Sequence, residues 1–196
     1  MFKKIFVVAG IIFSTSAFAQ AEKFAGASVG INAGFNNEYV SFSGTKIGNY
    51  NYNYNINGSY TFTLTEQATL ALGMTYDLGD STAVNATTMS NVASNSNPML
   101  LKSHYSINIE PGYALTESNL AYLKLAYHRA NAYQSGLSID KAITGTGYGI
   151  GTKYLMSKNT FFSLEIQKTV YNSYTYGTNS VTHTSTLGSV GFGYKF

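Results

Sequence analysis

The sequence of 196 residues has no cysteine, no tryptophan and only two prolines. Without cysteine, the chain can have neither a disulfide framework nor a thiolate metal site. Two prolines and 19 glycines are compatible with twisted β-structure that has few forced breaks. After Gln20, no apolar run approaches the roughly 18 residues of a membrane-spanning helix, so we expect no such helix.

Charge is also scarce. Charged residues make up 11% of the chain, whereas a soluble domain carries about 25%. A soluble domain of this size needs a charged surface to stay dispersed, and this chain cannot supply one. The formal net charge is only +3, and Lys3 and Lys4 contribute to it. No run of basic residues is present, so we expect no nucleic-acid partner.

The N-terminus has the pattern of an export signal. A basic pair precedes an apolar run, and the segment closes on an A-x-A cleavage site at Ala17–Ala19. The alternative is a buried N-terminal helix, which the cleavage site disfavours. We therefore expect residues 1–19 to be a secretory signal peptide and residues 20–196 to form one domain outside the cytoplasm.

Apolar and polar residues alternate with a period of two through most of the remaining chain. Residues 49–62, which read NYNYNYNINGSYTF, show the pattern clearly. Such alternation indicates β-strands with different surroundings on their two faces, and helical spacing fits none of these segments. Eight segments alternate in this way: about 25–35, 50–64, 69–79, 104–115, 121–128, 147–154, 162–170 and 189–196.

The connections between these segments fall into two classes that alternate along the chain. Three are tight, at 64–67, 115–119 and 155–159, and four are longer and polar, at about 37–48, 81–99, 131–142 and 172–181. Outer-membrane barrels have short periplasmic turns and longer external loops. The sequence therefore predicts an all-β fold, an eight-stranded antiparallel up-and-down transmembrane β-barrel with both termini in the periplasm.

Alternation alone leaves open which face meets which environment. A soluble barrel with an apolar interior alternates too, and the Asn/Tyr tract is also compatible with a prion-like stack. Here the polar face has few charges and many glycines, such as Gly147, Gly149 and Gly151, which suit a crowded barrel interior. Aromatic residues lie near both ends of the apolar faces, as in the girdles of a lipid-facing band. We therefore expect the apolar face to meet lipid.

The same phase assignment turns the charges in the middle of the strands inward. Hairpin folding about Glu117 places Glu110 opposite Lys124, and the next tight turn brings Lys153 near Glu165. Because unpaired buried charges are costly, we expect these pairs to form a polar plug. Lys168 is an exception that points outward near the long-loop rim. The predicted interior network comprises Asp77, Glu110, Lys124, Lys153 and Glu165.

The C-terminal VGFGYKF and the segment GTGYGIGTKYLMSKN resemble the small eight-stranded outer-membrane barrels, as in OmpX, the OmpA barrel domain and the opacity-type porin family. The resemblance implies a location in the outer membrane of a Gram-negative bacterium, in contact with the lipid bilayer and lipopolysaccharide. It also implies a monomer, a structural or surface-interaction role, and a possible extracellular ligand of the loops. The signal for the outer-membrane assembly machinery would comprise Val190, Phe192, Tyr194 and Phe196.

Two other functions need consideration. His183-Thr184-Ser185 resembles the His-x-Ser of outer-membrane lipid A deacylases, and a histidine can activate a nearby serine. However, the assignment of alternate residues to the two barrel faces turns both side chains inward, and no acid lies nearby in sequence. The third function is a narrow channel, but side chains fill an eight-stranded barrel. We therefore expect no catalytic residue, no metal and no cofactor, with His104 and His128 as interior hydrogen-bonding residues.

Overall fold

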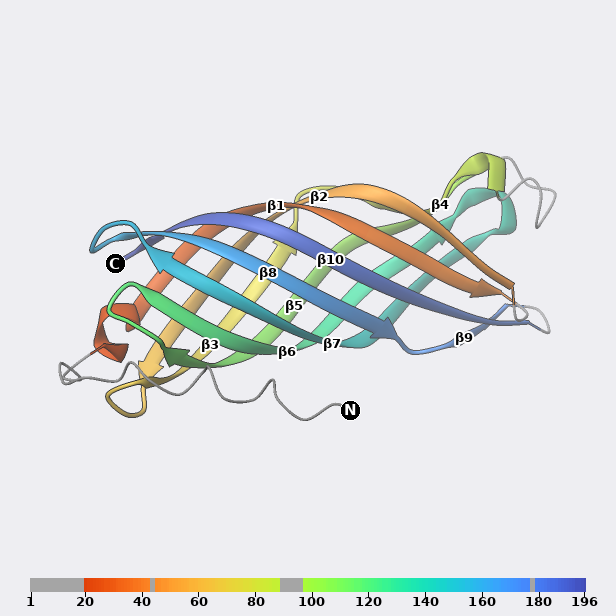
Figure 1. The fold of residues 1–196 in the computed structure, drawn as a ribbon. Coiled ribbons are helices and arrows are strands. Elements are labelled where there is room, and N and C mark those ends of the chain that lie inside the picture. The colour runs from red at the N-terminus through yellow and green to blue at the C-terminus, as the bar shows by residue number, and fades with distance from the viewer. Residues whose placement is uncertain (1–19, 43–44, 89–96, 177–178) are drawn as a thin grey trace, which may run out of the picture.

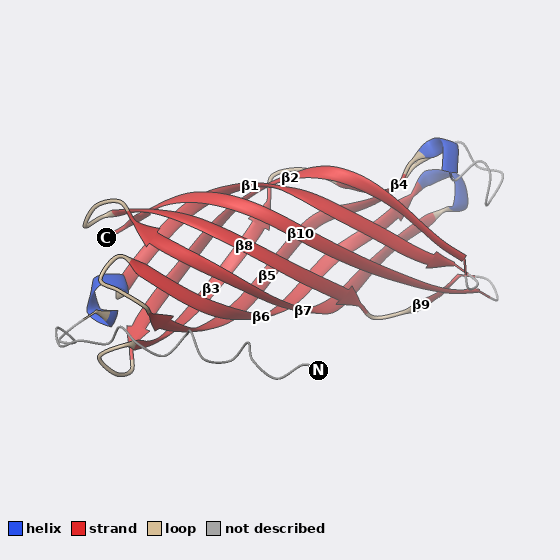
Figure 2. Ribbon diagram, in the orientation of Figure 1, coloured by secondary structure: helices blue, strands red, loops and turns tan. Residues whose placement is uncertain are grey.

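The computed structural model describes residues 20–42, 45–88, 97–176 and 179–196, so the expected signal peptide lies outside the described residues. Almost all of the described chain is β-strand (Figures 1 and 2). The strands are β1 (Gly26–Phe42), β2 (Thr45–Thr63), β3 (Ala68–Asp77), β4 (Ser81–Val84), β5 (Met99–Ala114), β6 (Asn119–Gln134), β7 (Ile139–Leu155), β8 (Thr160–Tyr171), β9 (Tyr174–Tyr176) and β10 (Asn179–Lys195). The described chain also contains two short 3-10 helices, η1 (Ala21–Phe24) and η2 (Ser135–Leu137), and a helical segment at residues 86–88.

The sheet closes on itself. Its order is β1-β2-β3-β5-β6-β7-β8-β10, and β10 pairs with β1. All these pairings are antiparallel, while β4 and β9 are short additions that pair with β5 and β10. The predicted eight-stranded up-and-down barrel is therefore confirmed. Within the described residues, no helix is long and apolar enough to cross a membrane.

The three tight turns occur where the sequence predicted them, and they share one local geometry. In each, a hydroxyl oxygen accepts a hydrogen bond from the backbone N–H three residues later: Ala68 N to Thr65 Oγ1 (2.9 Å), Asn119 N to Thr116 Oγ1 (3.0 Å) and Thr160 N to Ser157 Oγ (3.1 Å). Serine and threonine favour turns through such bonds. The turns lie at the end of the barrel that also holds the C-terminus (Figure 1).

At the opposite end of the barrel, three of the four predictions of a long loop are wrong, because strands occupy most of those residues. The segment expected at 37–48 is largely a hairpin, with β1 and β2 paired as far as Phe42 and Thr45. Residues expected at 131–142 are mostly the paired ends of β6 and β7, which extend to Gln134 and Ile139. Strands β9 and β10 likewise occupy much of 172–181. Between β4 and β5, the described residues 85–88 and 97–98 are not part of any strand, and the rest of this predicted loop lies outside the described residues.

These strand ends are ordered because the polarity of the two barrel faces is reversed there. Nearer the tight turns, apolar side chains point outward, as Ile31 does with 61% exposure, and polar ones such as Asn53 are buried inside. Towards the other end, apolar side chains point inward and form a core of their own. This core contains Val40, Ala83, Val84, Met99, Leu101, Ala130, Ala132, Ile139, Ile143, Tyr171, Tyr174 and Val181.

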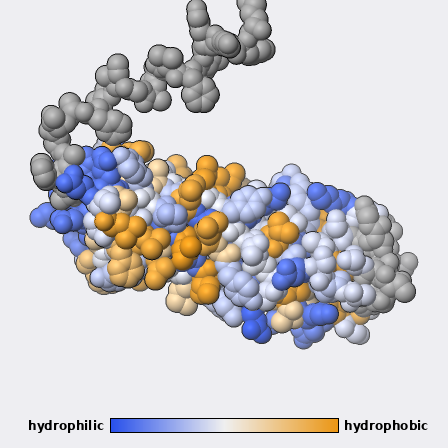
Figure 3. All heavy atoms as spheres, turned by 90° about the horizontal axis from the view of Figure 1, so that it is seen from below, coloured by the Kyte–Doolittle hydropathy of each residue, from blue (hydrophilic) through white to orange (hydrophobic). Residues whose placement is uncertain are grey.

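The reversal defines two parts of one barrel. Figure 3 shows hydrophobic residues gathered over the part nearer the tight turns, and more hydrophilic ones over the other end. The first part has the surface of a membrane-spanning barrel, and the second has that of a barrel in water. We call the second part the outer extension. It consists of the described residues within 36–50, 81–102, 129–145 and 171–185.

Candidate functional site

Four charged side chains form a chain of ion pairs in the middle of the barrel. Lys124 Nζ lies 3.0 Å from Glu165 Oε1 and 3.8 Å from Glu110 Oε1, and Lys153 Nζ lies 2.9 Å from Glu110 Oε2. The sequence correctly placed Glu110 beside Lys124. It was wrong to pair Lys153 with Glu165, because each of these residues instead contacts a partner on a strand beyond its neighbour in the sheet. The chain of charges thus joins β5, β6, β7 and β8.

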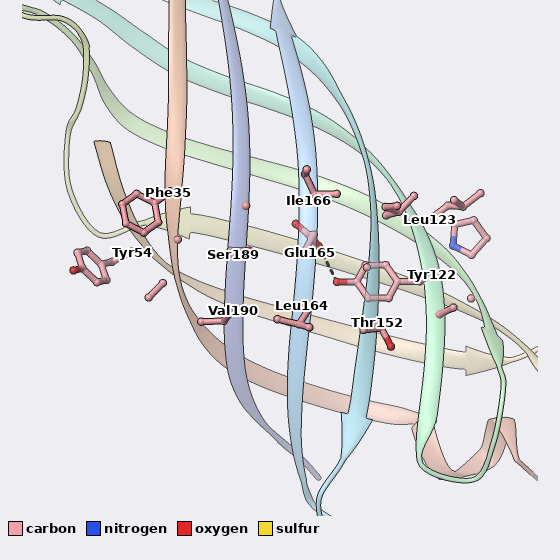
Figure 4. A pocket seen from close by; sticks show the side chains of 18 of the residues that line it. Phe35, Tyr54, Tyr122, Leu123, Thr152, Leu164, Glu165, Ile166, Ser189 and Val190 are labelled. Carbon is pink, nitrogen blue, oxygen red and sulfur yellow. Dashed lines mark hydrogen bonds between the residues drawn. The ribbon is translucent and has the colours of Figure 1, made fainter. Parts of the chain in front are cut away.

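A row of glycines on the inner face of β7 makes these crossings possible. A Cβ atom on Gly151 would lie 2.3 Å from Tyr122 Cζ, and one on Gly147 would lie 2.4 Å from His128 Nε2. The long side chains of β6 therefore pass over β7 to reach β8. Tyr122 donates a hydrogen bond of 2.9 Å to Glu165 (Figure 4). The glycines that the sequence placed on the inner face thus provide space inside the barrel.

Asp77 belongs to a separate hydrogen-bonded chain nearer the outer extension. Its Oδ2 lies 2.7 Å from His104 Nδ1, and His104 Nε2 lies 2.8 Å from His128 Nδ1. Gln167 Nε2 donates to His128 Nε2 at 3.0 Å. Both histidines are therefore hydrogen-bonded in the interior, as expected, and one of these bonds joins them to each other. Among the described residues, no group of three His, Cys, Asp or Glu side chains has the arrangement of a metal site.

The asparagines of the Asn/Tyr tract continue this chain. Asn53 Nδ2 donates to Asp77 Oδ2 at 2.8 Å, and Asn55 Nδ2 donates to Asn53 Oδ1 at 2.9 Å. Asn32 of β1 then donates to Asn55 at 2.7 Å. The polar side of the tract therefore faces the barrel interior, where each amide satisfies its neighbour.

Glu38, in the outer extension, is a buried acid that the sequence analysis missed. Its Oε1 accepts hydrogen bonds from Asn36 Nδ2, at 2.7 Å, and from Ser81 Oγ. Burial raises the pKa of Glu38 to about 7, although the hydrogen bonds from Ser81 and Asn36 act in the opposite direction. A signal for it was present in the sequence. The even-numbered residues of the first strand point inward, and Glu38 continues this series after Gly34 and Asn36.

The His183-Thr184-Ser185 motif is not arranged as a base and a nucleophile. Both His183 and Ser185 are buried and point inward, but they bond to different residues. His183 Nε2 lies 3.2 Å from Tyr174 Oη, while Ser185 Oγ donates to Asn36 Oδ1. Burial also lowers the pKa of His183 to about 4. The geometry therefore gives no support to the hydrolase hypothesis.

Little space remains inside the barrel. Two interior cavities have volumes of about 40 and 30 Å³, and both are lined by Asn32, Lys124 and Glu165. A cavity of this size holds a few water molecules at most. A hollow of about 1220 Å³ instead lies against the outer wall, where Phe35, Leu164 and Val190 line it (Figure 4). Because its surface belongs to the lipid-facing band, acyl chains are its natural occupants.

The C-terminal strand forms one side of the seam that closes the barrel. The side chains of Val190, Phe192, Tyr194 and Phe196 are exposed on the outer wall. The backbone N–H of Phe196 donates a hydrogen bond of 2.9 Å to Ala27 O on β1. The last residue of the chain is therefore part of the pairing that joins the two ends of the sheet.

Comparisons with known proteins agree with this architecture. A family model described as outer membrane protein beta-barrel domain matches residues 5–196. No curated protein matches the sequence. The structure of Ail from Yersinia pestis, in complex with the heparin analogue sucrose octasulfate, is 15% identical with a TM-score of 0.51. Neisserial surface protein A is 18% identical with a TM-score of 0.52. In both comparisons, the alignment covers 87% of this chain and 99% of the other.

Proposed function

Because this chain belongs to the outer membrane protein β-barrel family, and is thus an integral protein of the Gram-negative outer membrane, we propose that its role is to contact partners outside the cell through the outer extension. The observation that carries the proposal is the apolar core inside the extension. A barrel that served only to span the membrane would have no use for such a core.

The lengths of the strands support this role. A transmembrane strand needs about 9–11 residues, whereas β1, β7 and β10 have 17 and β2 has 19. Each aliphatic side chain that the extension buries contributes about 1.5–3 kcal/mol. The extension is therefore held as a firm wall above the membrane, and its tips have a defined position at which a partner can bind.

The filled interior disfavours transport. Side chains of the ion-pair chain cross the lumen at mid-depth, and the apolar core occupies the outer end. In planar-bilayer recordings of the folded protein, we expect no stable open conductance. We further propose that residues 1–19 are removed on export, that the mature chain is a monomer, and that its C-terminal strand is bound by the outer-membrane assembly machinery.

The proposal can be tested on whole cells that display the protein. Residues 85–98, which connect β4 to β5, would be replaced by a short Gly/Ser turn, and binding of the cells to extracellular matrix and to sulfated sugars would be measured. Sucrose octasulfate is a useful first probe because Ail is complexed with it. We expect the variant to keep the heat-dependent gel shift of a folded barrel but to bind less.

The matched control replaces a periplasmic turn, residues 64–67, with an equally short linker. The same replacement can be made in each of the other three connections at the outer end of the barrel, which follow β1, β6 and β8. If all four variants fold and bind as well as the wild type, the protein has no surface-interaction role.

A further inference from the structure

Three cations lie on the outer wall, next to the aromatic residues that bound the lipid-facing band. They are Lys102 of β5, Arg129 of β6 and Lys168 of β8. Arg129 is the ladder partner of Tyr105, and Lys168 is that of Tyr148. Tyr105 and Tyr148 are exposed on the outer wall. Since such aromatic residues occupy the membrane interface, the three cations lie at the level of the lipid headgroups.

The charge is confined to one side of the barrel. The neutral stretch begins on β10, directly beside β8, because Thr186 is the ladder partner of Lys168. On β10 and β1, the outward residues of this region are Asn37, Thr184 and Thr186, which are all neutral. The ion pairs between described residues include none of the three cations. The acid on the same wall is Asp140, which lies opposite Tyr133, further towards the tips.

A bulge in β5 places Lys102 on this wall. The ladder between β5 and β6 shifts between Lys102 and Tyr105, and Ser103 has a φ of 50°. After the shift, even-numbered residues such as Ser106 are buried in the interior, so an unbroken strand would turn Lys102 inward. Instead, Lys102 Nζ lies over the ring of Tyr133, 3.7 Å from its centroid. Bulges commonly redirect a side chain in this way.

We propose that Lys102, Arg129 and Lys168 bind the phosphate groups of an outer-leaflet glycolipid. Phosphates lie just beyond the hydrocarbon, and a cation near an anionic membrane surface contributes about 1 kcal/mol of attraction. Strands β6 and β8 are separated by two strand spacings, or about 10 Å. A headgroup that carries two phosphates on a sugar backbone can therefore reach cations on both strands. This proposal does not depend on any partner that binds the tips.

The test uses the folded full-length mature barrel in detergent, titrated with bisphosphorylated lipid A. We expect each of Lys102→Gln, Arg129→Gln and Lys168→Gln to raise the Kd about five-fold, which corresponds to about 1 kcal/mol per cation. The triple variant should lose about a hundred-fold. Lys46→Gln is the matched control, because Lys46 is an exposed cation at the tip of β2. It should leave the Kd unchanged.

Two further arms identify the ligand. Lipid A without phosphates should bind weakly, and equally to all variants. Inorganic phosphate should not compete at concentrations near the Kd of the lipid. The heat-dependent gel shift establishes that each variant is folded, and Lys102→Arg should restore binding at that position. An equal loss in Lys46→Gln, an insensitivity to lipid phosphates, or competition by free phosphate would each overturn the assignment.

Discussion

Lys124 of β6 reaches over β7 to bind Glu165 of β8, with Nζ 3.0 Å from Oε1. Both side chains lie in the membrane-spanning part of the barrel, and Lys124 also neutralises Glu110. One lysine thus connects two acids on β5 and β8, which are three strands apart in the sheet order β5-β6-β7-β8.

We predict that Lys124→Met destabilises the barrel strongly, by about 3–5 kcal/mol, because it removes the cation that pairs with Glu165, whereas Glu110 keeps its ion pair with Lys153. The double variant Lys124→Met/Glu165→Leu should lose less than the single variant, since it also removes the acid that Lys124→Met leaves unpaired. Urea unfolding in lipid vesicles, followed by circular dichroism, measures both. If the effects of the two single substitutions simply add in the double variant, the pairing carries no coupling energy and the interpretation is wrong.

The glycines of β7 yield a second prediction. Gly151→Ala should destabilise the barrel by about 1–3 kcal/mol, because the added methyl group overlaps Tyr122 and forces it away from Glu165. Gly188→Ala is the matched control, since no atom lies within 4 Å of the Cβ that it would add. The same unfolding assay should show little change for this control. A similar loss in both variants would point to strand propensity rather than to interior space.

The membrane-spanning half of the fold could be predicted from sequence because only one physical rule operates there. Lipid outside and polar groups inside impose a strict alternation, so the phases of Ile31, Asn53 and Lys124 follow directly. The tight turns could also be predicted, because each begins with a serine or threonine whose hydroxyl accepts a backbone hydrogen bond.

The outer extension was misjudged because its alternation is reversed. Val40, Ile143 and Val181 are apolar residues in the inward phase, among threonines and asparagines that read as loop. Their partners come from strands far apart in the sequence, so no local signal reveals the core. The prediction that Lys153 pairs with Glu165 failed for a similar reason, since Lys153 instead pairs with Glu110. The sequence indicates which hairpin neighbours face each other, but not which long side chains reach across an intervening strand.

The arrangement around Ser185 predicts a negative result. Ser185→Ala should leave lipid A unchanged, because Ser185 donates to Asn36 inside the barrel and His183 is bonded to Tyr174. Mass spectrometry of lipid A from cells that express either form makes the comparison, with cells lacking the protein as the baseline. Lipid A that loses an acyl chain only when Ser185 is present would restore the hydrolase hypothesis.

The position of Phe196 separates assembly from stability. We predict that Phe196→Ala reduces the amount of folded protein in the outer membrane of cells, if the assembly machinery recognises this residue. Refolding of the purified variant into vesicles should be nearly normal, because the backbone N–H that bonds to Ala27 is retained and the side chain is exposed. Phe62→Ala, which removes an exposed ring near the same end of the barrel, is the control. Equal losses of both variants in cells would remove any special role of Phe196.

Glu38 predicts a dependence of stability on pH. Its pKa is raised from 4.5 to about 7 in the folded protein, chiefly by burial. Between these values the folded state keeps a proton that the unfolded state has released, so the free energy of unfolding falls as pH rises through this interval. The slope from this residue approaches about 1.4 kcal/mol per pH unit. The protonated form is the more stable one because it spares the burial of a charge among Asn36, Ser81 and the apolar core of the outer extension.

Glu38→Gln should remove this slope and make the protein more stable than the wild type above pH 7. Glutamine keeps an Oε1 that can accept the hydrogen bonds from Asn36 and Ser81. Urea unfolding at a series of pH values measures the effect, with Glu66→Gln as a control at an exposed acid. If stability still falls between pH 4.5 and 7 in Glu38→Gln, the decrease comes from other groups and the assignment to Glu38 is wrong. The buried His183 cannot be its source, because a lowered histidine pKa makes stability rise with pH.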